Sequence, residues 1–197
     1  QVFGVTLGWS GNHQMVIDRT DDGQRLVHLG ELFEPGEITL APGESYESPV
    51  AYVGADSEDF HAFVREELTQ WPGGKMSPRP VTLNTWEGNY FDHRMVSLKA
   101  QASAAAELGI ERFVLDDGWF GKRDDDTTSL GDWDIDARKY PDGLKPLVDH
   151  VTGLGMQFGI WFEPEMVNAV SELYRAHPDW VLQIDGRPLL ESRNQLV

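Results

Sequence analysis

The first part of the chain alternates apolar and polar residues over short runs. Two such runs, residues 14–18 and 37–40, lie next to the turn sequences Asp21-Asp22-Gly23 and Ala41-Pro42-Gly43. Alternation bounded by Gly-containing turns is typical of antiparallel strands, in which every second side chain points to the same face. Residues 1–49 are therefore predicted to form an antiparallel β-structure.

A helical pattern follows. Residues 58–71 carry apolar positions at intervals of three and four, namely Phe60, Phe63, Val64 and Leu68, and the run stops at Pro72-Gly73-Gly74. This spacing indicates an amphipathic helix, and Pro followed by Gly ends one. We expect a helix that links the β-region to the rest of the chain.

Beyond Pro80, strand-like and helix-like segments alternate. The predicted strands are 81–86, 112–116 and 156–162, and the predicted helices are 94–108 and 144–154. The strands are apolar almost throughout, which is typical of parallel strands covered by helices. Gly109 and Gly155 follow the two helices, where a left-handed residue ends a helix and turns the chain. This βαβ alternation predicts a parallel sheet.

Such a sheet is either doubly wound or closed into a barrel. A doubly wound dinucleotide fold carries a Gly-x-Gly-x-x-Gly turn after its first strand, whereas this chain has Trp86-Glu87-Gly88-Asn89-Tyr90 there. A barrel is therefore favoured. Since a (β/α)8 barrel takes roughly 250 residues, we expect an α/β fold with an all-β part, in which the barrel is truncated.

Composition narrows the range of functions. The chain has 197 residues, of which 40% are hydrophobic, a formal charge of −17 and no Cys. The apolar content is that of a folded protein, whereas the negative charge opposes binding to nucleic acid or to an anionic membrane. No apolar run approaches the ~20 residues of a spanning helix, and disulfides and Cys-based zinc sites are excluded. We expect a soluble protein that binds neither nucleic acid nor membrane.

Aromatic and carboxylate side chains recur where the predicted barrel strands end. The clusters are Thr85-Trp86-Glu87, Asp116-Asp117-Gly118-Trp119-Phe120 and Trp161-Phe162-Glu163-Pro164-Glu165. The C-terminal ends of barrel strands form the face that carries the active site. Carboxylates bind the hydroxyls of a sugar, and indole rings cover its apolar face. The clusters predict a sugar site, although an isolated Asp116-Asp117 pair also suits a turn or a helix cap.

Other residues near these strand ends have simpler interpretations. Trp119 and Trp133 are expected to anchor the long loop after the second strand, because such a loop needs an apolar anchor. Glu163 and Glu165 suit acid/base catalysis and strand-end hydrogen bonding or helix capping equally. Neither Glu is therefore assigned as a catalytic residue.

The acidic residues 124–136 invite a calcium interpretation. They lack the Gly at the sixth position and the Glu at the twelfth that an EF-hand loop requires. We interpret them as a solvated acidic loop and expect neither a metal nor a cofactor. His150 and His177, each alone on a predicted helical segment, are interpreted as structural.

In this order, the segments resemble the α-galactosidases of glycoside hydrolase family 36. The matching stretches are 83–87, 113–121, 129–133, 158–167, 177–180 and 193–197. In that family a large β-sandwich precedes a (β/α)8 catalytic barrel. The resemblance implies that residues 1–55 are the end of the sandwich, that 56–80 are a linking helix and loop, and that 81–197 are the first part of the barrel.

The resemblance also implies roles for five residues. Asp116 and Asp117 match the carboxylates that receive the galactose 4- and 6-hydroxyls, Trp86 and Trp161 match tryptophans of the pocket wall, and Arg193 matches a basic group that reaches the sugar. The family's nucleophile, in a Lys-x-Asp motif, and its acid/base Asp would lie beyond Val197. Residues 1–197 are therefore expected to hold no catalytic residue and to be inactive alone.

The implied reaction is the retaining hydrolysis of terminal α-galactosides of the melibiose or raffinose type. Two alternatives stay open, a galactosyl transferase of the raffinose-synthase type and a sugar-binding relative without catalysis. The resemblance also implies a homo-oligomer, a tetramer, for the full-length protein. A cytoplasmic location is expected, and because the first residue is Gln rather than Met, a preceding signal peptide stays open.

Overall fold

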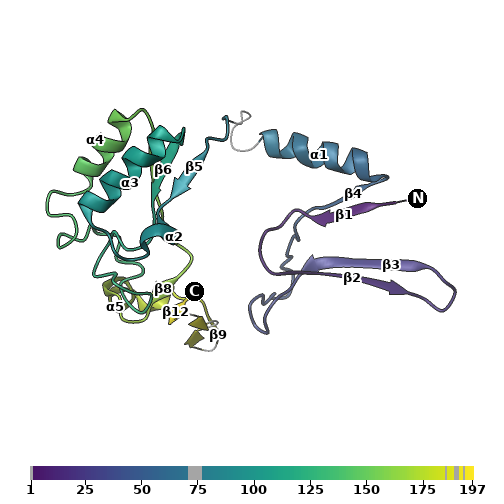
Figure 1. Ribbon diagram of the computed structural model, residues 1–197. Coiled ribbons are helices and arrows are strands. Elements are labelled where there is room, and N and C mark those ends of the chain that lie inside the picture. Colours follow the sequence, from purple (N-terminus) through teal and green to yellow (C-terminus); the bar gives the residue numbers. More distant parts are fainter. Residues whose placement is uncertain (1, 71–76, 185, 189–190, 193) are drawn as a thin grey trace. The chain divides into compact units, whose positions relative to one another are not determined.

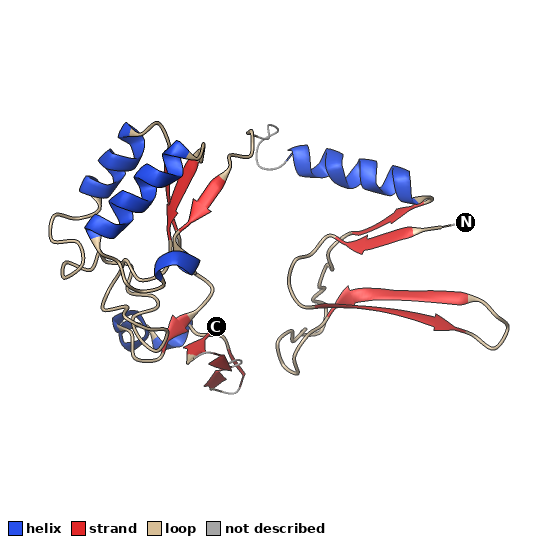
Figure 2. Cartoon of the chain, in the orientation of Figure 1, coloured by secondary structure: helices blue, strands red, loops and turns tan. Residues whose placement is uncertain are grey.

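The computed structural model describes residues 2–70, 77–184, 186–188, 191–192 and 194–197 (Figure 1). The chain divides into two units, Gln1–Pro78 and Arg79–Val197. The first consists of strands, loops and one helix, whereas helices and strands alternate along the second (Figure 2). The boundary between the units lies next to the change of pattern at Pro80.

Two antiparallel strand pairs form the sheet structure of the first unit. They are β1 (Gly4–Leu7) with β4 (Ala51–Gly54) and β2 (His13–Arg19) with β3 (Arg25–Glu31). The turn between β2 and β3 contains the predicted Asp21-Asp22-Gly23, with Gly23 at a φ of 87°. The prediction of antiparallel strands is confirmed for these segments.

The strand predicted at residues 37–40 is wrong. These residues form a bend and an irregular segment. A strand needs a neighbour to pair its N–H and C=O groups, and none of the described strands pairs with this segment. Instead, Glu37 folds back locally and accepts a hydrogen bond from the backbone N–H of Glu34 at 2.8 Å.

Helix α1 (Ser57–Gln70) packs on β4 within the first unit. The Phe60 ring lies so close to Gly4 and Gly54 that a Cβ at those positions would meet it at 2.5 and 3.0 Å. The Phe63 ring lies 4.9 Å from that of Tyr52. The predicted helix is confirmed, and its apolar face is the one that touches the strands.

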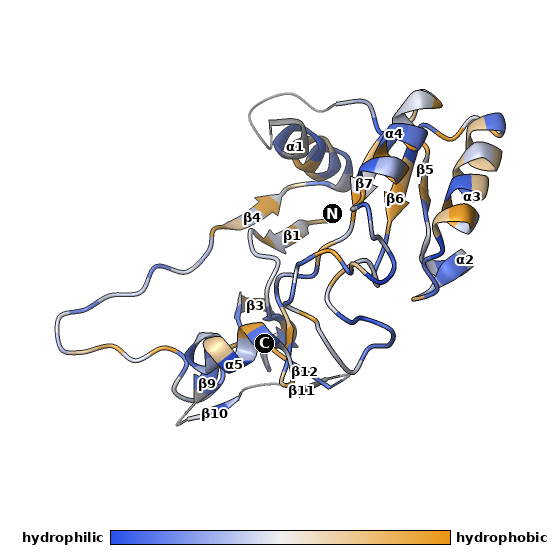
Figure 3. Cartoon of the chain, turned by 90° about the vertical axis from the view of Figure 1, so that its left-hand side faces the viewer, coloured by the Kyte–Doolittle hydropathy of each residue, from blue (hydrophilic) through white to orange (hydrophobic). Residues whose placement is uncertain are grey.

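A parallel sheet is the centre of the second unit. Its strands are β5 (Thr82–Asn84), β6 (Arg112–Leu115) and β7 (Gln157–Ile160), in that order. The connecting helices α3 (Met95–Glu107) and α4 (Lys145–Gly153) lie side by side on one face of the sheet (Figure 1). Much of β6 and β7 is hydrophobic (Figure 3), and Phe113 and Leu115 of β6 are completely buried. The predicted order of parallel strands and helices is confirmed.

Glycine ends both connecting helices. Gly109 follows α3 with a φ of 81°, and Gly155 follows α4 with a φ of 83°. Residues with a Cβ rarely adopt this left-handed conformation, whereas Gly does so at no steric cost. These two turns return the chain to β6 and β7.

Short elements complete the second unit. They are α2 (Trp86–Asn89), α5 (Glu172–Ala176), the 3-10 helix η1 (Pro178–Trp180), an antiparallel sheet of β11 (Glu191–Ser192), β12 (Gln195–Leu196) and β8 (Val167–Asn168), and the pair β9 (Gln183–Ile184) and β10 (Arg187–Pro188). The unit is thus an α/β fold with parallel and antiparallel sheets. None of the helices in the described part of the chain is long and apolar enough to cross a membrane.

Candidate functional site

A cavity of about 690 Å³ lies at the C-terminal ends of the parallel strands. Its lining comes from six separate segments of the second unit, namely Asn84, Trp86, Glu87, Phe91, Asp116, Asp117, Arg123, Asp126, Trp161, Glu163 and Gln195. The cavity gathers these residues because the carboxyl ends of parallel strands meet at one edge of the sheet. It contains four of the five predicted substrate-binding residues, and the fifth, Arg193, lies outside the described residues.

Asp116, directly after β6, is held by neutral groups. Asn84 Nδ2 donates a hydrogen bond to its Oδ2, and the backbone N–H of Asp117 donates to its Oδ1 at 2.7 Å. Its own backbone N–H donates to Thr85 Oγ1 at 3.0 Å. Since each carboxylate oxygen accepts two hydrogen bonds, both oxygens keep capacity for a ligand hydroxyl in the cavity.

Asp117 is held by the positively charged side chain of Arg123. Arg123 donates from Nε to Asp117 Oδ1 and from Nη2 to Oδ2, both at 2.9 Å. Only 1% of Arg123 and 6% of Asp117 is exposed. This is a buried bidentate ion pair, the strongest class of charge-assisted contact. Arg123 was not predicted from the sequence, because a loop residue carries no periodic signal.

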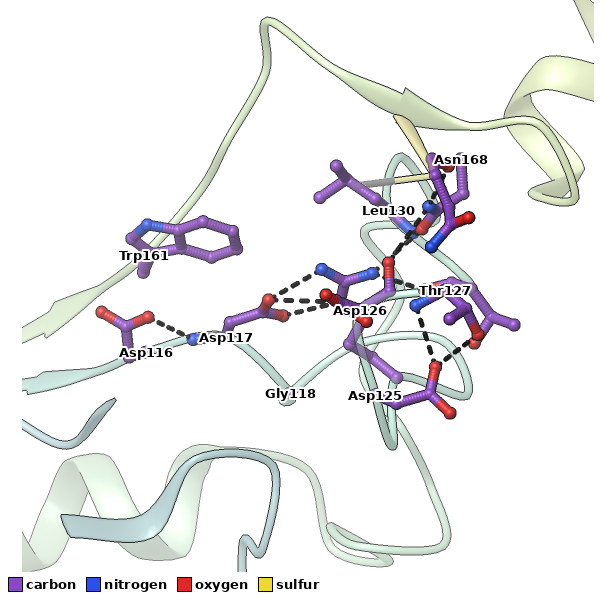
Figure 4. A network of polar contacts seen from close by, with 12 residues as sticks. Asp116, Asp117, Gly118, Asp125, Asp126, Thr127, Leu130, Trp161 and Asn168 are labelled. Carbon is purple, nitrogen blue, oxygen red and sulfur yellow. Dashed lines mark hydrogen bonds and ion pairs between the residues drawn. The ribbon is translucent and has the colours of Figure 1, made fainter. Parts of the chain in front are cut away.

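The two predicted wall tryptophans reach the cavity from different elements. Trp86 begins α2 and makes edge-to-face contacts with the rings of Tyr90 and Phe91. Trp161 follows β7, and its backbone N–H donates to Leu115 O of β6 at 2.9 Å. Figure 4 shows Trp161 on one side of Asp116 and Asp117. An indole wall beside carboxylates is the arrangement predicted for a pyranose.

Trp119 and Trp133 hold the loop in place, as predicted. Trp119 Nε1 donates to the backbone oxygen of Trp161 at 3.0 Å, and the ring centroids of Trp119 and Trp133 are 6.2 Å apart. Phe120 and Phe162 complete this aromatic cluster. Behind the cavity, the cluster fixes the backbone from which Trp161 projects.

Glu163 and Glu165, for which the sequence allowed the same roles, lie in different places in the structure. Glu163 lines the cavity, whereas Glu165 lines a separate cavity of about 170 Å³. Glu87 belongs to a strand-end cluster that the sequence singled out, whereas Asp126 and Gln195 belong to segments that the sequence singled out for other reasons, and neither was predicted to line the site. Those two belong to the acidic loop and to β12, which reach the site only through folding.

The acidic loop has ionic partners. Arg138 donates to Asp124 Oδ2 at 2.9 Å and to Asp136 Oδ2 at 2.6 Å. The hydrogen bond from Arg138 holds the pKa of Asp124 below its usual range. Asp136 is buried, so the interpretation of a solvated loop is wrong for this residue. Within the described ranges, no group of three or more His, Cys, Asp or Glu side chains could hold a metal ion.

Lys139 joins the loop between α2 and α3 to two points of the connection between β6 and α4. Its Nζ donates to the backbone oxygens of Phe91 at 3.0 Å, Gly118 at 2.9 Å and Arg123 at 2.7 Å. Gly118 has a φ of 111°, and a Cβ there would meet the Phe91 backbone at 3.2 Å. The turn that carries Asp116 and Asp117 is therefore closely packed.

His93 lies in the same packed region. Its Nδ1 is 2.8 Å from the Tyr140 hydroxyl. Burial and, after it, the charge of Lys139 lower the pKa of His93 to about 4. Burial also raises the pKa of Tyr140. Both groups are therefore neutral near pH 7.

His150 and His177 have structural contacts. The Nε2 atom of His150, on α4, is 3.1 Å from Ser103 Oγ and 3.0 Å from Lys99 O, both on α3. The His177 ring stacks on that of Trp180 with the centroids 4.0 Å apart. These contacts suit the interpretation of both histidines as structural, although His177 lies between α5 and η1 rather than within a helix.

The family is decided by comparison with known proteins. The family model described as melibiase matches residues 45–197 of this chain. The chain belongs to the melibiase family. The resemblance to family 36 α-galactosidases is confirmed by this match and by the names of the relatives.

Three melibiase relatives illustrate the similarity. An α-galactosidase of Escherichia coli is 47% identical over 204 residues, which cover 100% of this chain and 28% of that protein. The crystal structure of the GH36 α-galactosidase AgaA from Geobacillus stearothermophilus is 43% identical, with a TM-score of 0.82 over 99% of this chain and 28% of that one. A doubly substituted AgaA crystallised with raffinose is 42% identical, with a TM-score of 0.80 over 99% and 28%. The chain thus spans about 28% of the length of these relatives.

Proposed function

We propose that this chain is the galactose-binding part of an α-galactosidase that hydrolyses terminal α-galactosides with retention of configuration. The observation that carries the proposal is the pair Asp116 and Asp117, side by side at the end of β6 in a cavity walled by Trp86 and Trp161. The relatives support it, since all three are named α-galactosidases and AgaA was crystallised with raffinose.

The cavity favours galactose through its carboxylates. Asp116 and Asp117 would accept charge-assisted hydrogen bonds from the 4- and 6-hydroxyls, and Trp86 and Trp161 would cover the ring. The 4-hydroxyl of glucose points in another direction, so glucose would leave a buried carboxylate unpaired, which costs about 1–3 kcal/mol or more. Arg193 would contact the same sugar from a neighbouring segment.

Retaining hydrolysis needs two further carboxyl groups. One attacks the anomeric carbon, and the other, about 5–5.5 Å away, protonates the leaving oxygen. The proposal assigns both to parts of the protein beyond residues 1–197, so this stretch would supply recognition of the substrate and no covalent chemistry.

A more detailed fold accompanies the proposal. The parallel strands β5–β7 with α3 and α4 on one face support a (β/α)8 barrel, and the antiparallel pairs of the first unit support a β-sandwich. The domain limits 1–55, 56–80 and 81–197, a homotetramer and a cytoplasmic location belong to the same proposal.

The proposal is tested by assaying the full-length protein with p-nitrophenyl α-galactoside and with raffinose. Release of galactose is expected. Transfer of galactose to sucrose as the main reaction would point to the transferase instead, and binding of galactose without turnover would point to a non-catalytic relative.

The roles of the two carboxylates are tested by Asp116→Ala. We expect kcat/KM to fall at least ten- to a hundredfold, because one or two charge-assisted hydrogen bonds of about 1.5–3 kcal/mol each are lost. Asp116 is the better probe, since Asp117→Ala would leave Arg123 buried without its anion and cost about 3–5 kcal/mol of stability.

The matched control is Asp149→Ala on α4. Asp149 is exposed and pairs with Lys145 across one helical turn, so its loss should leave kcat/KM unchanged. A lowered melting temperature of Asp116→Ala together with normal kcat/KM in the folded protein would mean that Asp116 only shapes a turn.

A further inference from the structure

The guanidinium of Arg123 is held on all sides. While Nε and Nη2 bind Asp117, Nη1 donates to Thr128 O at 2.8 Å and to Asn168 Oδ1 at 2.9 Å. The backbone oxygen of Arg123 accepts from Lys139 Nζ. Every nitrogen of the guanidinium is therefore engaged, which leaves it one orientation.

Asn168 supports this arrangement from behind and is itself saturated. Its Oδ1 also accepts from the backbone N–H of Leu130 at 2.8 Å, and its Nδ2 donates to Asn194 O at 2.8 Å and Asp126 O at 3.3 Å. It is 0% exposed. Figure 4 shows Asn168 at the far end of a network that begins at Asp116 and Asp117.

Stability alone is a weak reason for this pair. Burying two charges costs desolvation that their attraction often only balances, and apolar residues of similar volume frequently do as well. Both residues also line the cavity, where the orientation of the Asp117 carboxylate determines how it accepts a hydrogen bond from a ligand. On the basis of the proposed function, we infer that Arg123 is a positioning residue that fixes the orientation of the Asp117 carboxylate toward a sugar hydroxyl.

The charges around Asp117 make this role measurable. The cavity also contains the carboxylates of Asp116, Asp126, Glu87 and Glu163, against the cations Arg123 and Lys139, with His93 neutral beneath. Without Arg123, adjacent buried carboxylates would face one another with no bidentate cation. Their repulsion would then turn the Asp117 carboxylate away from the orientation that its two hydrogen bonds to Arg123 hold.

Two substitutions separate charge from geometry in the full-length enzyme. Arg123→Gln removes the charge and the two-pronged donor, so kcat/KM should fall about ten- to a hundredfold. Arg123→Lys keeps the charge without the two-pronged donor. Its kcat/KM should fall too, but less than that of Arg123→Gln.

Arg112 provides the matched control. It begins β6, at the opposite end from Asp116, and also donates through Nε and Nη2, to Gln157 Oε1 at 3.0 and 2.7 Å. Arg112→Gln and Arg112→Lys should leave kcat/KM unchanged. This control accounts for any general effect of losing an arginine that donates through Nε and Nη2.

The inference is overturned if folded Arg123→Gln keeps the wild-type kcat/KM. If Arg123→Gln does not fold, Arg123→Lys decides, since wild-type kcat/KM in that variant would equally overturn it. Calorimetric measurement of galactose binding separates this inference from the proposed function. A wild-type protein without hydrolytic activity refutes the proposed function, whereas weaker galactose binding by Arg123→Gln than by the wild type would still support the role of Arg123. Absence of both activity and binding rejects both.

Discussion

At the scale of single residues, Asp116 and Asp117 differ in what holds them although they are consecutive. Asp116 is bound by an amide and a backbone N–H, and Asp117 by the guanidinium of Arg123. Their shared position after β6 follows from the strand pattern. The difference between them arises because the loop after β6 folds back over the strand end and brings Arg123 to Asp117. This difference makes Asp116→Ala a better test of ligand binding than Asp117→Ala.

His93 gives the stability of the protein a pH dependence. In the folded state its pKa is about 4, because burial disfavours the charged ring, whereas in the unfolded state it is near 6.5. The unfolded state therefore binds more protons between these values. The contribution of the neutral ring is complete above pH 6.5 and is lost as the pH falls toward 4, by up to about 3 kcal/mol.

The measurement is the free energy of unfolding of wild type and His93→Phe between pH 7.5 and 4. Phe does not titrate, so the advantage of the wild type over the variant should shrink as the pH falls through this window. The carboxylates contribute equally to the stability of both proteins, so their contributions cancel in the difference. A constant difference across the window would contradict the assignment.

At the scale of elements, the strands and helices lie close to where the sequence predicts them. The period of apolar residues locates α3, α4, β6 and β7 to within about two residues, because each buries one face or both faces in the same core. The strand predicted at 37–40 failed because a strand depends on a partner elsewhere in the chain. Gly109 and Gly155 show that the turns were also predictable.

Replacing Gly153, at the end of α4, and Gly155, just after it, by Ala should change the stability in opposite directions. Gly155→Ala places a Cβ at a φ of 83°, which should cost about 1–2 kcal/mol. Gly153 lies in the last turn of α4 without a positive φ, so Gly153→Ala should stabilise by about 0.5 kcal/mol. A Cβ at either position would have no neighbouring side chain or loop within 4 Å, so steric contacts do not contribute to the difference in stability.

Thermal unfolding of the two variants checks this prediction. The melting temperature should fall for Gly155→Ala and rise slightly for Gly153→Ala. Equal changes in both variants would mean that the backbone conformation at Gly155 is not what makes glycine necessary there.

At the scale of the whole molecule, the two units differ in how much apolar surface they bury. The second unit encloses a core built from α3, α4 and the parallel sheet. The β2–β3 hairpin of the first unit instead exposes Met15, Ile17 and Val27 by 52%, 63% and 47%. Ile17 is paired with Val27 and Met15 with Leu29, so these side chains share one face.

We expect further strands of the proposed β-sandwich to cover this face in a protein as long as the relatives. Antiparallel sheets bury one face and leave the other to solvent. In residues 1–197 alone, Ile17→Lys should lower the binding of a hydrophobic dye and change the stability little. In the full-length protein the same substitution should destabilise by about 2 kcal/mol or more, because it buries a charge.

Gln14→Lys is the matched control, since Gln14 lies on the opposite face of the same strand. It should affect neither dye binding nor stability in either protein. Unfolding curves that show no loss of stability for Ile17→Lys in the full-length protein would mean that this face stays exposed there.

The sequence alone determined the order of elements and the placement of Trp86, Asp116, Asp117 and Trp161 at strand ends, and it indicated the family. These follow from local periodicity, from motifs read in order, and from the rule that parallel strands end at one edge. Whether the four bind substrate stays a prediction.

Only the tertiary structure decided which other groups meet them. Arg123, Lys139 and Asn168 come from a loop and a two-residue strand with no periodic signal, and their partners lie up to 48 residues away in the sequence. The depressed pKa of His93 and the burial of Asp136 arise in the same way. Burial and charge pairing depend on which distant segments fold together, and no local pattern records that.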